Sequence, residues 1–196
     1  MQVTTLSFEN IHNHGELFAN MLRARHKTFI QRNQWELPEA NGMEFDQYDT
    51  PASRWVAVHE LGQVLAGVRL TPTTARCGIY SFMIRDAQLG LLDSIPKDLL
   101  FDEAPVHAHV WESSRVFVSE KVPAKMRLRV QCSLIDEMVR SARNLGATSL
   151  IGIVPEHSPR LARRTGIDCE VAGPVIETDA GDRSVCINIG LATKLH

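Results

Sequence analysis

The sequence lacks the features that would direct a chain into or across a membrane. Its 196 residues contain no apolar stretch near the roughly 20 residues that a membrane span requires. The N-terminal residues MQVTTLSFENIH show no basic region followed by an apolar run, so they do not resemble a signal peptide. A formal net charge of −2 gives no reason to expect nucleic acid or an anionic membrane as a partner. We therefore expect a cytoplasmic protein.

Cysteine is scarce, and no two cysteines lie close together in the sequence. The four cysteines, Cys77, Cys132, Cys169 and Cys186, are far apart and form no CxxC motif. Metal sites and disulfide frameworks need closer or paired spacing, so we interpret these residues as reduced and mostly buried thiols.

Several common catalytic motifs are also missing. The chain has no GxGxxG or GxxxxGK[ST] loop to cradle a phosphate and no GxSxG nucleophile elbow. HNH at 12–14 and HAH at 107–109 each place two histidines on one side of an extended chain, without an obvious third ligand. We predict ordinary histidines there and no metal site.

What the sequence does contain is an alternation of strand and helix patterns over one domain, residues 1–196. Its 44% hydrophobic and 22% charged residues are typical of a globular protein. Periodicity predicts strands at 2–8, 54–60, 63–72, 106–118, 148–154 and 182–192, and helices at 16–30, 123–146 and 157–166. In the second helix, the predicted apolar face consists of Leu128, Cys132, Ile135, Met138, Val139, Ala142 and Leu145. This order predicts an α/β sheet with helices on both faces.

Charged residues interrupt segments that otherwise look apolar. The segment GMEFDQYDT at 42–50 contains Glu44, Asp46 and Asp49, while Arg69 lies in the apolar strand LAGVRLTP. A solvated loop would tolerate the acids, and an isolated strand arginine is usually a surface or edge residue. Charges in core-like strands are costly unless they are paired, so one shared site explains the set better.

The same argument applies to HVWESSRVFV, which contains Glu112 and Arg115. Residues three apart in a regular strand point to opposite faces, but a β-bulge would bring both side chains to one site. With Arg25 included, the set has four negative and three positive charges, which favours a cationic ligand.

These residues, in this order, resemble the acyl-homoserine lactone synthases of the LuxI type. The matching features are Arg25 with Phe29, then Trp35, GMEFDQYD, VRLTPT and WESSR, spread over about 90 residues. The resemblance implies a GNAT-like fold, a three-layer sandwich in which helices flank a mixed central sheet. It also implies a quorum-sensing acyltransferase that uses S-adenosylmethionine as co-substrate, without a further cofactor. The products would be an N-acyl-L-homoserine lactone and methylthioadenosine.

The resemblance assigns roles to individual positions. The acidic segment would form a wall of the adenosylmethionine site, and Arg69 and Arg115 would brace the acids. An amine must lose a proton before it attacks a thioester, so a carboxylate base is needed, with Glu44 as first choice and Asp46 and Glu112 as alternatives. Arg25, Phe29, Trp35 and Phe82 are candidate substrate contacts. For the aromatic pair Phe29 and Trp35, plain core packing is the competing interpretation.

The resemblance says less about the acyl donor and about the acyl chain that is transferred. The segment SEKVPAKMRL, where GNAT enzymes bind the pyrophosphate of coenzyme A, contains no glycine, which favours an acyl-acyl-carrier protein over acyl-CoA. Carrier proteins are acidic, and Lys125, Arg160, Arg163 and Arg164 are candidate docking residues. Gly152 and Val154 fall in the segment that lines the family's acyl pocket, where Gly152 would widen the pocket. The alternatives are a GNAT-type acyltransferase that acylates another amine and a non-catalytic ligand-binding relative.

Overall fold

A computed structural model describes residues 1–164, 167–177 and 181–191, apart from the side chains of Leu161 and Arg164. The chain divides into two compact units. Unit 1 comprises residues 1–70 and 115–141, and unit 2 comprises residues 71–114 and those from 142 onward. Strand β6 (Val110–Val118) supplies residues to both units, because the boundary falls between Ser114 and Arg115.

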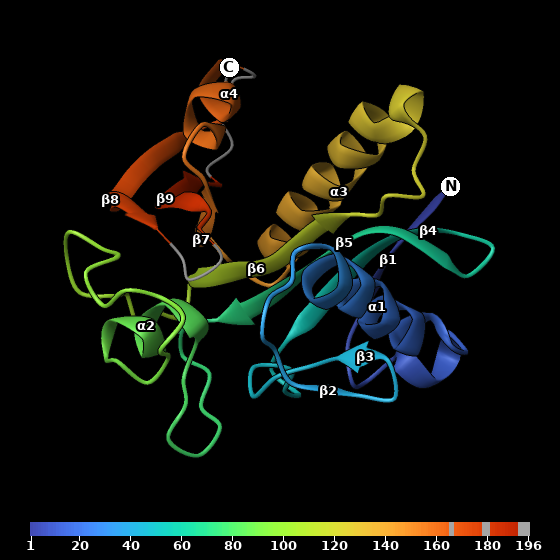
Figure 1. The fold of residues 1–196 in the computed structure, drawn as a ribbon, viewed down its shortest axis with the longest axis horizontal. Coiled ribbons are helices and arrows are strands. Elements are labelled where there is room, and N and C mark those ends of the chain that lie inside the picture. The colour runs from blue at the N-terminus through green and yellow to red at the C-terminus, as the bar shows by residue number, and fades with distance from the viewer. Residues whose placement is uncertain (165–166, 178–180, 192–196) are drawn as a thin grey trace. The chain divides into compact units, whose positions relative to one another are not determined.

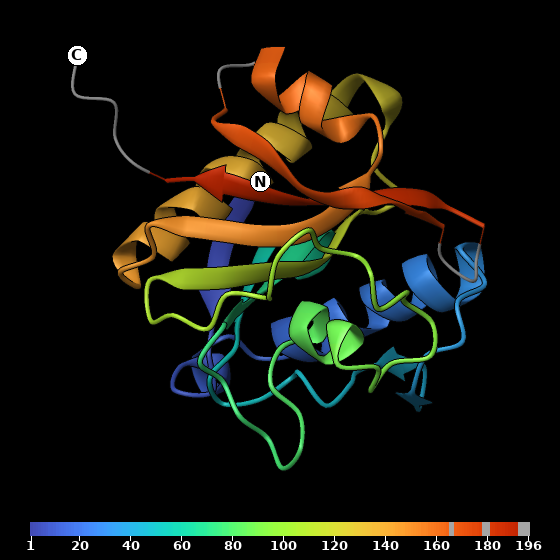
Figure 2. The ribbon, with the colours of Figure 1, turned by 90° about the vertical axis from the view of Figure 1, so that its left-hand side faces the viewer.

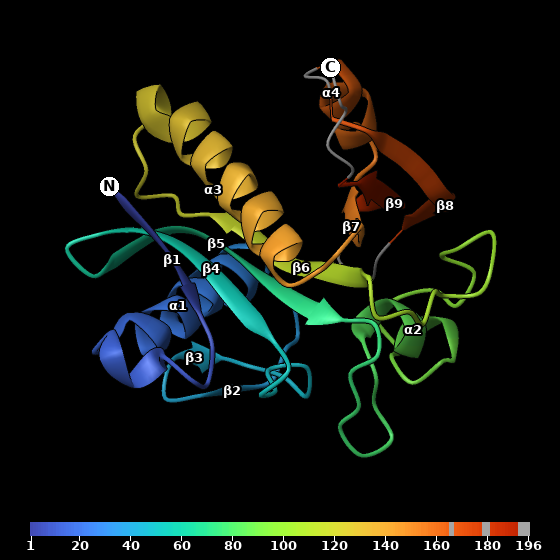
Figure 3. The same cartoon turned by 180° about the vertical axis from the view of Figure 1, so that it is seen from behind.

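Unit 1 contains an antiparallel arrangement of β1 (Gln2–Leu6), β4 (Arg54–Glu60) and β5 (Gln63–Pro72). Helix α1 (Leu17–Arg25) lies on one face of these strands and α3 (Ala124–Asn144) on the other (Figures 1 and 3). The alternating strand residues explain the two layers. Leu6 belongs to the buried cluster on the α1 side, whereas Thr5 hydrogen-bonds to Ser141 of α3.

Two short elements in unit 1 complete the surroundings of the acidic segment. Helix α1 continues directly into a π-helix, η2 (His26–Arg32), and a small hairpin follows, made of β2 (Glu39–Ala40) and β3 (Met43–Glu44). A short 3₁₀ helix, η1 (Ile11–Asn13), precedes α1.

Unit 2 is built on β7 (Ser149–Pro155), β9 (Arg183–Gly190) and β8 (Cys169–Glu177), which are antiparallel, with β6 running parallel to β7. Helix α4 (Ser158–Arg164) lies on one face of β7, β9 and β8, and α2 (Met83–Gln88) lies on the other (Figure 2). Val185 and Cys186 show the alternation, because the first packs in the cluster on the α4 side and the second in the cluster of α2. The full strand order is β1-β4-β5-β6-β7-β9-β8, which confirms the predicted mixed sheet with helices on both faces.

The main differences between the predicted and the observed elements concern four segments. The predicted helix 16–30 changes from α to π geometry at His26, and the predicted strand 106–118 begins only at Val110. Strand β8 was not predicted, because Gly173 and Pro174 interrupt its apolar pattern. The structure accommodates them in a register shift between Val171 and Val175. The hairpin of β2 and β3 was also missed, although Asn41-Gly42, both at positive φ, is a standard hairpin turn.

Two burial predictions were correct only in part. On α3 the buried residues include Val130, Leu134 and Met138, whereas Leu128 and Ile135 are exposed. The apolar positions of this helix therefore form two stripes rather than one. Cys77 and Cys132 are exposed, and only Cys169 and Cys186 are buried. No helix in the described part of the chain is long and apolar enough to cross a membrane.

Candidate active site

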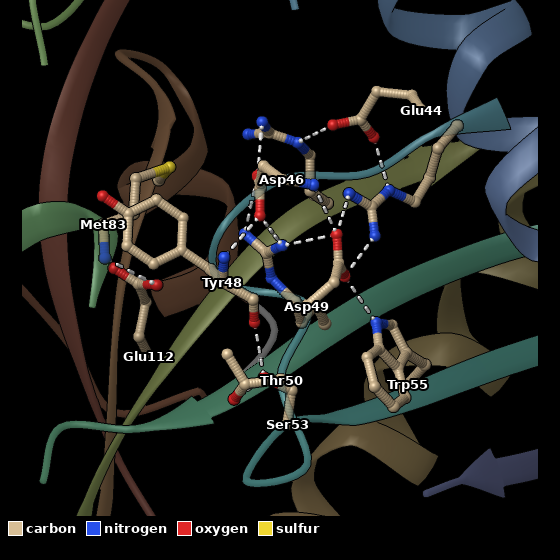
Figure 4. Close-up of polar contacts among 12 residues, drawn as sticks. Glu44, Asp46, Tyr48, Asp49, Thr50, Ser53, Trp55, Met83 and Glu112 are labelled. Atoms are coloured by element: carbon tan, nitrogen blue, oxygen red, sulfur yellow. Dashed lines mark hydrogen bonds and ion pairs between the residues drawn. The ribbon is translucent and has the colours of Figure 1, made fainter. Parts of the chain in front are cut away.

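The acidic segment lies in unit 1, where it faces guanidinium groups from three other elements. Glu44 ends strand β3, and Asp46 and Asp49 belong to the turn that follows it (Figure 4). The turn is self-supporting, because the backbone N–H of Asp46 donates to Asp49 and that of Tyr48 donates to Asp46. The chain thus places three carboxylates on one side of a short, rigid segment.

Three arginines neutralise these acids. Arg25 of α1 donates through Nε to Glu44 at 2.5 Å and through both terminal nitrogens to Asp49 at 2.7 and 2.9 Å. Arg69 of β5 contacts Asp46 at 2.5 Å and Asp49 at 3.1 Å. Arg115 of β6 contacts Glu44 at 3.1 Å and Asp46 at 2.8 Å. We call these six residues, Arg25, Glu44, Asp46, Asp49, Arg69 and Arg115, the acid–arginine network.

The network is buried, and its charges perturb one another strongly. The side chains of Arg25, Arg69 and Glu44 are fully inaccessible to solvent. Burial alone would raise the pKa of Asp46, but the charges of Arg69 and Arg115 outweigh it and lower that pKa below its usual value. Burial likewise opposes ionisation of Asp49, yet Arg69 and Arg25 hold the pKa of Asp49 far below its ordinary range. Both aspartates are therefore carboxylates at neutral pH.

Aromatic side chains surround the network within unit 1. Trp55 of β4 donates its indole N–H to Asp49 at 2.9 Å, and the guanidinium of Arg69 lies over the ring of Tyr48. Phe29 stacks on Trp35 with ring centroids 5.1 Å apart, and Arg115 lies over Phe29. Phe29 is buried in the cluster of α1, and Trp35 packs against that cluster. Both rings therefore take part in core packing, and Phe29 also lies against a network arginine.

The network changes two expectations from the sequence. Its three carboxylates are balanced by three guanidinium groups, so the excess negative charge that the sequence suggested for a cationic ligand would come from Glu112 and not from the acidic segment. Glu44, the first choice for the base, is fully buried, and both of its oxygens accept hydrogen bonds from arginines. A carboxylate held in this way is poorly placed to accept a proton from a substrate amine.

Glu112 has a different environment, in unit 2. Its carboxylate accepts hydrogen bonds from the backbone N–H groups of Ile84 at 2.8 Å and Met83 at 3.3 Å (Figure 4). These amides begin helix α2. Asp86 fixes the turn before that helix, because it accepts hydrogen bonds from the backbone N–H and the hydroxyl of Ser81. This Ser81–Asp86 pair was not predicted, because its five-residue spacing matches no common capping motif.

Phe82 and Cys186 belong to one apolar cluster in unit 2. Phe82 is fully buried in a cluster with Ile84 and Ile151, so it contributes to the core of unit 2. Burial, with a further contribution from the charge of Glu112, raises the pKa of the Cys186 thiol to about 12. Cys186 is therefore a protonated thiol at neutral pH.

Strand β6 has an irregular backbone conformation at Arg115. Arg115 has φ +55°, a left-handed conformation that is uncommon for a residue with a side chain. Regular alternation along the strand therefore breaks between Glu112 and Phe117. Such strain costs about 1–3 kcal/mol and is found mainly where function or surrounding contacts maintain it. Here the ion pairs of Arg115 with Glu44 and Asp46 provide those contacts.

The structure gives a different reason for a glycine at position 152 than a wider acyl pocket. A Cβ at this position would lie 2.6 Å from the hydroxyl oxygen of Ser113 and 3.0 Å from the carbonyl oxygen of Ser113. The space next to Gly152 is therefore occupied by strand β6 and does not widen a pocket. Val154 packs against the cluster of Val185 and Ile187, on the α4 side of the sheet.

The predicted docking residues lie on two different elements. Lys125 is exposed near the start of α3, in unit 1. Arg160 and Arg163 are exposed on α4, in unit 2, and the side chain of Arg164 is outside the described residues. Arg160 lines a cavity of about 250 Å³ together with Glu156, His157 and Arg183. Arg183 of this cavity is paired with Glu156 at 3.0 Å. Among the described residues, no group of three or more His, Cys, Asp or Glu side chains is arranged to hold a metal ion.

Comparison with known proteins adds independent information. The family model described as "Autoinducer synthase" matches residues 9–185. A protein from Ralstonia solanacearum named "Acyl-homoserine-lactone synthase" is 31% identical over 163 residues, which cover 80% of this chain and 74% of that protein. A second protein with the same name, from Vibrio anguillarum, is 28% identical over 88% of this chain and 85% of its own length.

Solved structures show the same relationship. The structure described as TofI in a ternary complex with an inhibitor and MTA has a TM-score of 0.75 and 28% identity, covering 97% of this chain and 92% of that one. Two more distant structures share the fold. A structure described as a CoA-dependent acyl-homoserine lactone synthase, BjaI, has 19% identity and a TM-score of 0.78 over 98% and 84% of the two chains. An acyl-CoA N-acyltransferase from Pseudomonas aeruginosa has 13% identity and a TM-score of 0.62 over 96% and 99%.

Proposed function

The chain belongs to the LuxI-type acyl-homoserine-lactone synthase family, and within this family we propose that it takes its acyl group from an acyl-acyl-carrier protein. It is an acyl-homoserine-lactone synthase with a GNAT-like fold that uses S-adenosylmethionine and an acyl donor. The donor, the residue roles and the acyl chain are parts of the proposal.

The observation that favours the carrier protein is the connection between β6 and α3. Strand β6 ends at Val118 and α3 begins at Ala124, and the intervening residues SEKVP contain no glycine. A pyrophosphate is bound most readily by a glycine-rich loop whose backbone N–H groups can approach it closely. A carrier protein presents phosphopantetheine without the nucleotide, so it needs no such loop.

We assign the base to Glu112 rather than to Glu44. The backbone amides of Met83 and Ile84, which are neutral, donate to Glu112, whereas Glu44 is held between two guanidinium groups. Glu112 would accept a proton from the ammonium group of S-adenosylmethionine, directly or through a water molecule. The acid–arginine network would act as a rigid wall of the substrate site and keep Arg115 in its strained conformation.

The two chemical steps then require few further groups. The freed amine attacks the thioester carbonyl, the C–S bond breaks, and the pantetheine thiol leaves on the carrier protein with a proton. In the second step the carboxylate of the acylated substrate attacks its own γ-carbon. The bond from that carbon to the sulfonium sulfur breaks, which releases neutral methylthioadenosine and closes the lactone. Orientation within the site can contribute several kcal/mol to such an intramolecular step, on the order of 7–11 in favourable cases.

The test is product analysis with matched donors. Purified protein is mixed with S-adenosylmethionine and the same acyl groups on carrier protein and on coenzyme A, and the products are identified by mass spectrometry. We expect methylthioadenosine and a lactone in both series, with the higher kcat/KM for the carrier-protein series. A higher kcat/KM with acyl-CoA would overturn the donor assignment, and the BjaI-like fold makes acyl-CoA the second candidate. Comparison across acyl groups would also identify the chain, which Gly152 and Val154 do not specify.

A further inference from the structure

Helix α3 carries a second apolar stripe that faces solvent. Leu128 is 71% exposed and Ile135 is 37% exposed, and Cys132 between them is also exposed. Positions 128, 132 and 135 follow the i, i+4, i+7 spacing of one helix face. The buried residues of the same helix, including Val130, Leu134 and Met138, lie on a different face, so the exposed stripe is not part of the core formed by the described residues.

Two unpaired cations border the stripe. Lys125 precedes Leu128 by three residues and Arg129 precedes Cys132 by three, so each lies beside an apolar member of the stripe. Both are exposed, and within the described residues neither has an ion-pair partner. The neighbouring arginines are engaged elsewhere, because Arg127 donates to the carbonyl of Ser119 and Arg140 pairs with Glu137.

This combination fits a particular kind of partner. An apolar centre with a charged rim is the usual composition of a protein interface, and a basic rim selects an acidic partner. A second copy of this chain fits less well, because the two cations outnumber Asp136 and symmetric pairing would bring two faces of net positive charge together. Asp136 is the acidic residue next to Cys132, and it lies toward the other end of the stripe.

We propose that the exposed face of α3, consisting of Lys125, Leu128, Arg129, Cys132 and Ile135, is the docking surface for an acidic amphipathic helix of the acyl-carrier protein. The inference rests on the carrier protein being the donor, as proposed above. It assigns the docking role to α3, which immediately follows the β6–α3 connection, and not to Arg160 and Arg163 of α4. The cations steer the acidic helix, and the apolar stripe supplies the contact area that becomes buried on binding.

Cys132 offers a direct probe with an internal control. The full-length protein is alkylated with iodoacetamide while the concentration of a carrier protein, whose pantetheine thiol is blocked as a stable thioether, is increased. Mass spectrometry of peptides gives separate rates for Cys132 and Cys77, the two exposed thiols. We expect the carrier protein to slow alkylation of Cys132 by about tenfold or more while Cys77 reacts at an unchanged rate. Equal rates for Cys132 with and without saturating carrier protein would overturn the proposal.

Kinetics of variants provide the second readout. Lys125→Glu/Arg129→Glu and Leu128→Ser/Ile135→Ser should each raise the KM for acyl-carrier protein by about tenfold while leaving the KM for the same acyl group on coenzyme A unchanged. Leu61→Ser is the matched control, since Leu61 is fully exposed at the turn between β4 and β5. Circular dichroism and thermal unfolding establish that each variant is folded.

The outcomes separate this inference from the proposed function. A raised carrier-protein KM in Arg160→Glu but not in the α3 variants would overturn α3 docking and leave the synthase assignment intact. Protection of Cys132 that depends on the enzyme's own concentration, without carrier protein, would show a second copy on this face and would also overturn the inference. A donor preference for acyl-CoA would instead contradict the proposed function itself.

Discussion

Arg25 and Glu44 form an ion pair in which neither side chain is exposed to solvent, with Nε of Arg25 2.5 Å from a carboxylate oxygen of Glu44. The two residues come from helix α1 and strand β3, nineteen positions apart. Removing two charges from water costs several kcal/mol per ion, so this pair is retained only because the remaining donors and acceptors also find partners. The pair therefore fixes the position of the acidic segment relative to α1 and makes each partner sensitive to substitution.

Glu44→Gln should destabilise the fold as well as reduce turnover. The substitution removes one carboxylate from a balanced set and leaves the network with one uncompensated positive charge, and breaking a buried pair in this way typically costs about 3–5 kcal/mol. Urea denaturation followed by circular dichroism would measure the loss. A variant that is as stable as the wild type but inactive would return Glu44 to the role of base.

Glu112→Gln should separate chemistry from stability. A glutamine side-chain oxygen can still accept hydrogen bonds from the backbone N–H groups of Met83 and Ile84, but a neutral amide cannot take a proton from the substrate. We expect the rate of amide formation to fall by about 10²- to 10⁴-fold, measured in single-turnover experiments, with little change in Tm. Wild-type rates would eliminate Glu112 as the base.

Acid should destabilise the protein through Asp46 and Asp49. The folded state holds the pKa values of both carboxyl groups below the ordinary value of 3.8. Near and below pH 4 the unfolded chain therefore binds protons that the folded chain does not, and the free energy of unfolding falls as the pH is lowered. Their stabilising effect is fully present above about pH 5.

The measurement is the free energy of unfolding between pH 6 and pH 3. Asp49→Asn should show a smaller slope than the wild type over the acidic part of this range. Asp93→Asn is the control, because Asp93 is exposed, and it should keep the wild-type slope. Identical slopes in all three proteins would show that the network aspartates do not couple folding to protonation.

Gly152→Ala should be destabilising although it adds one methyl group. The new Cβ would lie 2.6 Å from the hydroxyl oxygen of Ser113, and overpacking of this kind costs about 1–3 kcal/mol. Removing that hydroxyl in Ser113→Ala should recover part of the loss in the double variant, as measured by Tm. Additive effects of the two substitutions would mean that the two side chains do not meet. The glycine would then be required for some other reason.

Much of this protein follows from local pattern. The hairpin of β4 and β5, the helix α3 and strands β6, β7 and β9 were predicted because apolar periodicity and turn residues act over a few neighbouring positions. The buried charged residues were also recognisable, because ionisable groups in core-like strands are costly and point to partners even when the partners are unknown. Arg69 in LAGVRLTP and Glu112 in HVWESSR are the clearest examples.

Only the tertiary structure decided which groups each charged side chain contacts. The sequence gives Glu44 and Glu112 the same chemistry, yet the fold places the first between two guanidinium groups and the second on the backbone amides of α2. In the same way, one apolar pattern on α3 became a buried stripe and an exposed stripe, because a helix packed on one side can bury only part of its surface. Local sequence sets which groups are available, and the long-range packing of the chain decides which of them meet.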